Sequence, residues 1–158
     1  MSNQTSSSSD ARRRRSRALA VVAAVAAAEA LWLIAEFVFG MHLQAPAGNG
    51  APQPMDIGPG TVAVASVVLS LIGWAVLATL ERFTSRARGI WLALALVALV
   101  ASLGMPLSGS GVAPADRVVL VLMHLSVAAV VVPVLFRTSH RDGPAVHPAS
   151  RHLAREAA

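Results

Sequence analysis

The sequence contains no cysteine, no tyrosine and no lysine, and only 13% of its 158 residues are charged. Without cysteine, the chain has no means of forming a disulfide, a catalytic thiolate, an iron–sulfur ligand set or a cysteine-type zinc site. The low charge content, together with 55% hydrophobic residues, does not suit a soluble domain. The composition therefore indicates a protein that lies in an apolar environment.

The apolar residues are gathered in long segments instead of being spaced periodically. These segments cover residues 18–39, 61–80, 90–107 and 117–136. Because about 20 apolar residues of helix cross a bilayer's hydrocarbon core, the chain offers four spans. We expect an all-α fold, an integral membrane four-helix bundle in up-down-up-down order. Residues 1–17 are expected to form a disordered basic cytoplasmic leader, 18–136 the transmembrane domain and 137–158 a flexible cytoplasmic tail.

The arginines supply all 13 basic residues, and 12 of them lie before the first span, between the second and third spans, or after the fourth, which is one side of a four-span protein. Three groups flank the spans, namely Arg12, Arg13, Arg14, Arg15 and Arg17, then Arg82, Arg86 and Arg88, and then Arg137, Arg141, Arg151 and Arg155. The exception is Arg117, at the end of the third connection. Since positive residues concentrate on the inner side of a membrane, the N-terminus, the second connection and the C-terminus are predicted to be cytoplasmic.

The first span also has features of a cleaved signal peptide. Arginines precede an alanine-rich run that contains Ala26, Ala27 and Ala28. The apolar run nevertheless continues to Phe39, which makes it long enough to span. Its removal would leave three spans and place one arginine group on the wrong side, so we expect the segment to be retained.

Small residues recur at a spacing typical of helix packing. Ala20, Ala24 and Ala28 follow one another at four-residue intervals in the first span, as do Ser66 and Ser70 in the second. Such spacing allows helices to approach closely. We expect this packing inside one bundle, with a dimer face as the alternative. A further prediction places Trp91 at the inner membrane interface as an anchoring indole.

Four ionisable side chains lie within or at the ends of two spans. Glu29 and Glu36 are seven residues apart in the first span, and Arg117 and His124 are seven apart in the fourth, so each pair shares a helix face. Counted at about 1.5 Å per residue, Glu29 and His124 lie at one depth, and Glu36 and Arg117 at another. We predict that the two helices pack through Glu29 with His124 and Glu36 with Arg117, because pairing lowers the cost of burial.

Two interpretations of this polar set are open. In the structural one, Glu29 and His124 form a hydrogen-bonded pair that fixes the register of the helices. In the functional one, the same pair relays protons or cations, since ionisable groups inside a membrane often mark a transport path. For Glu36 and Arg117 the alternative to pairing is that both side chains reach the outer interface without a partner.

Several short patterns carry a resemblance to a known family. One is the arginine-led, alanine-rich first span. The others are the short motifs Gly73-Trp74, Leu80-Glu81-Arg82, Met123-His124-Leu125 and Val132-Pro133. With them, residues 12–138 resemble an uncharacterised actinobacterial family of four-span membrane proteins, domain of unknown function 6069. The resemblance implies a bacterial plasma membrane and a helical bundle, and it brings no known activity and no site residues.

The sequence thus predicts a multi-pass protein of the bacterial plasma (inner) membrane, a non-enzymatic accessory or structural component. The alternative is a proton-coupled small-solute transporter that uses Glu29 and His124. No catalytic residue and no cofactor is predicted. No metal site is predicted either, because the tail histidines lack the spacing of metal ligands. Those histidines are His140, His147 and His152.

The lipid bilayer is the expected partner. Nucleic acid is not expected, because the arginines flank spans instead of covering one folded surface. A homo-oligomer or an unknown membrane partner is left open. Anionic lipid headgroups are expected at Arg12, Arg13, Arg14, Arg15 and Arg17.

Overall fold

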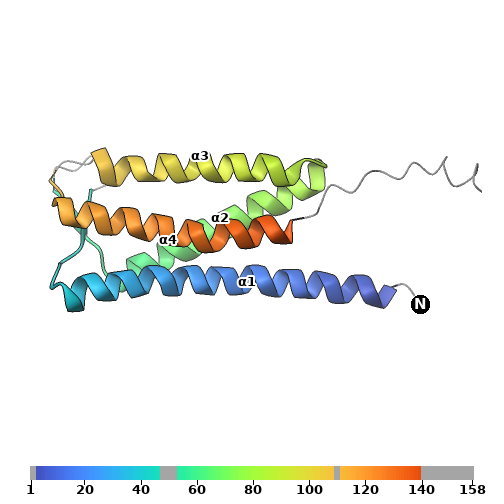
Figure 1. The fold of residues 1–158 in the computed structure, drawn as a ribbon, viewed down its shortest axis with the longest axis horizontal. Coiled ribbons are helices and arrows are strands. Elements are labelled where there is room, and N and C mark those ends of the chain that lie inside the picture. Colours follow the sequence, from blue (N-terminus) through green and yellow to red (C-terminus); the bar gives the residue numbers. More distant parts are fainter. Residues whose placement is uncertain (1–2, 47–52, 109–110, 140–158) are drawn as a thin grey trace, which may run out of the picture.

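The computed structural model describes residues 3–46, 53–108 and 111–139, which form helices joined by short connections (Figure 1). The helices are α1 (Asn3–Leu33), which continues into the π-helical turn η1 (Ile34–Val38), α2 (Pro59–Phe83), α3 (Ala87–Ser108) and α4 (Pro114–Thr138). Two short strands, β1 (Gln44–Ala45) and β2 (Met55–Asp56), pair antiparallel within the connection between α1 and α2.

Four helices are long and apolar enough to cross a membrane. The candidate spans are Ala11–Val38, Pro59–Phe83, Ala87–Gly104 and Pro114–Thr138. Each includes nearly all of an apolar segment that the sequence marked as a span. The mostly helical architecture with four membrane-length helices is therefore confirmed, and it indicates a multi-pass membrane protein.

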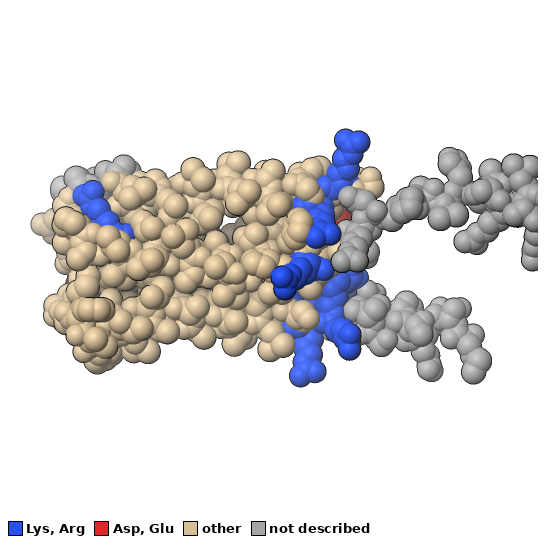
Figure 2. All heavy atoms as spheres, viewed as in Figure 1, with Lys and Arg blue, Asp and Glu red and all other residues tan. Residues whose placement is uncertain are grey.

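The helices lie side by side, and α1 and α3 each pack against both α2 and α4 (Figure 1). The start of α1 and the end of α4 lie at the same end of the bundle (Figure 1). Figure 2 shows arginine side chains around this end, with a basic side chain also at the opposite end. The opposite end contains the paired strands β1 and β2. Leu43, which directly precedes β1, is inserted into the core with 2% of its surface exposed.

Helix α1 starts earlier than the sequence suggested. It begins at Asn3, so residues 3–17, expected to be a disordered leader, continue the helix. Extending a helix from a formed span avoids the cost of nucleation, and arginine is a good helix former. The predicted tail of residues 137–158 begins within the last turn of α4, and from residue 140 onward it lies outside the described residues.

Small residues provide the contact between α1 and its neighbours. Ala20, Ala24 and Ala28 are 4%, 0% and 1% exposed, which confirms their predicted place in close helix packing. Trp91, by contrast, is not an interfacial anchor. It is 3% exposed, and its Nε1 donates a hydrogen bond of 2.9 Å to the carbonyl of Gly73. The indole lies inside the bundle, where this bond satisfies its ring N–H.

Candidate functional site

The structure does not form the predicted pair between Glu36 and Arg117. Glu36 Oε1 lies 3.0 Å from Nδ1 of His42 instead. Arg117 donates from Nε to the carbonyl of Val112 at 3.3 Å and from Nη1 to that of Leu107 at 3.2 Å. Glu36 lies in η1, whose turn is wider than that of an α-helix, so a count of seven residues from Glu29 does not give its direction around the helix axis.

The pair between Glu29 and His124 is not formed either. Nδ1 of His124 lies 2.7 Å from the carbonyl oxygen of Leu120, one turn earlier in α4. Glu29 Oε1 is buried and has no hydrogen-bond partner among the residues that the structure describes. Helices α1 and α4 do pack against each other, and the buried hydrophobic residues of α1 are alanines. The His124 imidazole forms its hydrogen bond within its own helix instead.

A buried polar cluster at the arginine-rich end joins three helices. Arg17 of α1 donates from Nη2 to Oε1 of Glu81 in α2 at 2.8 Å, and from Nη1 to Oε2 at 3.3 Å. The same guanidinium donates from Nε to Oγ1 of Thr138 in α4 at 3.1 Å, and from Nη2 to the Thr138 carbonyl at 2.9 Å. The side chains of Arg17 and Glu81 are 6% and 10% exposed. The planar guanidinium thus binds two partners in one fixed geometry.

Sequence reasoning treated Arg17 as a topology marker and missed this cluster. A signal was present, because Arg17 lies three, seven and eleven residues before Ala20, Ala24 and Ala28. These intervals place the arginine on the helix face that the alanines turn toward the bundle. Burying an arginine on a packing face is costly unless a hydrogen-bond acceptor pairs with it, and Glu81 is that acceptor.

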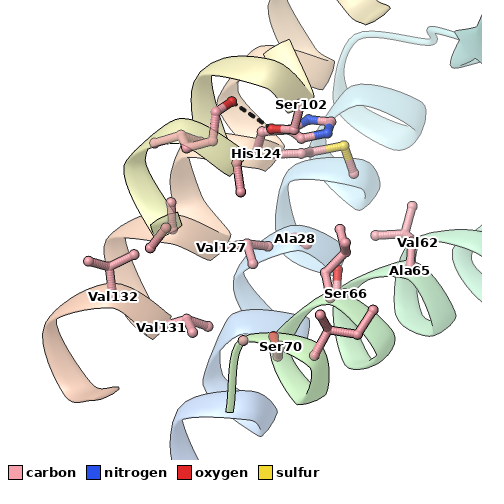
Figure 3. Close-up of a pocket in the computed structure, with 18 of the residues that line it drawn as sticks. Ala28, Val62, Ala65, Ser66, Ser70, Ser102, His124, Val127, Val131 and Val132 are labelled. Atoms are coloured by element: carbon pink, nitrogen blue, oxygen red, sulfur yellow. Dashed lines mark hydrogen bonds between the residues drawn. The ribbon is translucent and has the colours of Figure 1, made fainter. Parts of the chain in front are cut away.

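A cavity of about 620 Å³ lies between α2, α3 and α4, with Ala28 of α1 at one wall (Figure 3). Its lining is largely leucine, valine, isoleucine and alanine. The side chains in the lining that can form hydrogen bonds are Thr61, Ser66, Ser70, Trp91, Ser102 and His124. Glu29 is not among the lining residues, so the cavity contains one member of the predicted pair and not the other.

The sequence predicts no metal site. Of the five histidines, His42 and His124 belong to the part of the chain that the structure describes. Within the described residues, no group of three or more His, Asp or Glu side chains is placed to hold a metal ion. The three tail histidines, all beyond residue 139, lie outside that part of the chain.

The model of a family of unknown function, DUF6069, matches residues 8–141. The match includes all four membrane-length helices and the connections between them. No curated protein and no solved structure matches this chain.

Proposed function

This chain belongs to DUF6069, a family of unknown function, and we propose that it is a non-enzymatic accessory or structural component of a bacterial plasma membrane. The observation that carries the proposal is the buried cluster of Arg17, Glu81 and Thr138, which ties α1, α2 and α4 together at one end. A bundle fastened in this way suits a fixed scaffold better than a carrier whose helices must shift against one another. The cavity adds support, because the polar groups of the described residues that line it are hydroxyls, an indole and one imidazole, and none of these residues carries a carboxylate.

We also propose that both termini are cytoplasmic and that the helices cross the membrane in up-down-up-down order. The arginines at the end shared by the start of α1 and the end of α4 support this orientation (Figure 2). On that side, anionic lipid headgroups are proposed to bind Arg12, Arg13, Arg14 and Arg15. Arg17, also expected there from the sequence, directs its guanidinium to Glu81 and Thr138.

Cysteine labelling tests the orientation cleanly, because the chain has no native cysteine. Gln53→Cys lies in the connection between α1 and α2 and Ser85→Cys in the one between α2 and α3, and both positions are exposed. In spheroplasts, a membrane-impermeant maleimide is expected to label Gln53→Cys and not Ser85→Cys. Inside-out vesicles should give the reverse pattern. Labelling of Ser85→Cys in spheroplasts would place both termini outside the cell.

The alternative, proton-coupled transport of a small solute by Glu29 and His124, draws on one observation. The Oε1 atom of Glu29 is buried without a hydrogen-bond partner in the described part of the chain, and such groups inside a membrane are often functional. Its test is proton flux into reconstituted vesicles under an imposed pH gradient.

The accessory role predicts that vesicles with the wild-type protein take up protons no faster than empty vesicles. Glu29→Gln and His124→Ala should leave this background unchanged, with each variant first shown to fold by circular dichroism and size-exclusion chromatography. Flux through the wild type that disappears in folded Glu29→Gln would establish transport instead.

A further inference from the structure

The cavity between α2, α3 and α4 opens sideways toward the surface that faces lipid. Leu69 and Ile72 of α2 and Val97 of α3 all line it, and they are 54%, 53% and 67% exposed on the bundle. Its inner wall is formed by α4 and by Ala28 of α1, which is 1% exposed. A molecule dissolved in the bilayer can therefore reach the cavity without entering water.

Ser70 places a hydroxyl in the cavity wall that lacks a hydrogen-bond partner among the described residues. The residue is 2% exposed, and an unpaired polar group at membrane depth is costly. Thr79 and Ser126 avoid that cost by donating to carbonyls of their own helices, at 2.9 and 2.8 Å. Because Ser70 does not, its hydroxyl can bond to a molecule in the cavity.

His124 and Ser102 offer acceptors to the same space. A carbonyl oxygen only accepts, so Nδ1 of His124 carries a proton in its 2.7 Å bond to Leu120, and in the tautomer that carries this proton alone Nε2 is an acceptor. Ser102 uses its proton in a 2.8 Å bond to the carbonyl of Leu99, which leaves the lone pairs of its oxygen (Figure 3). This part of the cavity therefore matches a ligand that donates a hydrogen bond.

The lining also defines the charge and size of the occupant. Of the described residues that line the cavity, none is Arg, Asp or Glu, so a charged ligand would find no countercharge there. A volume of about 620 Å³ lies within the range of small-molecule sites. An uncharged molecule with an alkyl body and a hydroxyl group meets each of these conditions.

We propose that this cavity binds an uncharged, hydroxyl-bearing lipid, which enters from the bilayer between α2 and α3. The ligand's hydroxyl donates to Nε2 of His124, the Ser70 hydroxyl donates to an oxygen of the ligand, and the alkyl body packs against the apolar walls. This goes beyond the accessory role proposed above and adds a ligand to it. A scaffold without any ligand would still satisfy that role, so the two proposals fail separately.

Photolabelling in lipid vesicles tests the site with a defined probe, hexadecan-1-ol that carries a diazirine in its alkyl chain. Its methyl ether has the same chain and lacks the hydroxyl proton, and a phospholipid with the diazirine in one acyl chain reports on ordinary boundary lipid. The alcohol is expected to label peptides of α2 and α3 that line the cavity, and excess unlabelled hexadecan-1-ol should suppress that labelling. The ether should label them about fivefold less, the effect of one lost hydrogen bond.

Variants separate the cavity from the lipid-facing surface. Ser70→Ala keeps the shape of the wall and is expected to weaken labelling about fivefold. Ala98→Phe places a ring in the cavity and should abolish it, while Ala93→Phe, on the same helix and outside the lining, should have no effect. Size-exclusion elution identical to the wild type qualifies each variant for the comparison.

Two outcomes would overturn the proposal. One is equal labelling of the cavity peptides by the alcohol, the ether and the phospholipid probe, which would make the cavity a boundary-lipid contact. The other is labelling by the alcohol that folded Ala98→Phe does not reduce, because the molecule would then lie elsewhere.

Discussion

Replacing Arg17 with alanine is expected to lower the free energy of unfolding by about 3 kcal/mol, the cost of breaking a buried ion pair from one side. The substitution removes two hydrogen bonds to Glu81 and two to Thr138, which join α1 to α2 and α4 at one end of the bundle. Unfolding by sodium dodecyl sulfate in mixed micelles, followed by tryptophan fluorescence, measures the change.

Arg14→Ala is the matched control, because it removes the same charge from an exposed position on the same helix. It is expected to change stability by less than about 0.5 kcal/mol. Arg17→Lys should recover only part of the loss, since an ammonium group cannot reproduce the two parallel bonds of a guanidinium to Glu81. Equal stability of Arg17→Ala and Arg14→Ala would show that the cluster does not hold the helices.

The helices themselves could be predicted from the sequence, because crossing a bilayer requires a length and polarity that a single segment displays. The ends were less certain. Residues 3–17 extend α1 where composition favoured disorder, since helix propagation from a formed span depends on a neighbouring segment that composition does not take into account.

The contacts between helices were harder to predict, because counting residues gives the depth of a side chain and not its direction around the helix axis. Depth placed Glu36 near Arg117, but the π-helical turn Ile34–Val38 changes the direction of Glu36. For Arg17 the direction could be read, since the alanines of the first span mark the packing face. The useful pattern was therefore small residues in register with a charged one.

The cavity could not be predicted in the same way. Its polar residues come from α2, α3 and α4, and whether they share a space depends on how far those helices diverge. That divergence follows from the packing of all four helices, with Trp91 between α2 and α3. The spacing of Ser66 and Ser70 predicted close packing of small residues, and both are indeed buried, yet both also line the cavity.

The close approach of α1 to the rest of the bundle provides the second large effect. Ala24 is 0% exposed and packs in a core cluster with Leu77, Val131 and Leu135. Within a bilayer, helices associate mainly through such fitting surfaces, because lipid chains are as apolar as the side chains they would replace. A larger side chain at this position has no space unless α1 moves away from its neighbours.

Ala24→Leu is therefore expected to lower the free energy of unfolding by about 3 kcal/mol, at the upper end of the cost of overpacking a core. Ala23→Leu adds the same atoms at an exposed position of the same helix and should change it by less than about 0.5 kcal/mol. Thermal unfolding of both variants in one detergent gives the comparison. If Ala24→Leu proved as stable as Ala23→Leu, α1 would not pack through its alanine face, and the inward direction inferred for Arg17 from that face would lose its basis.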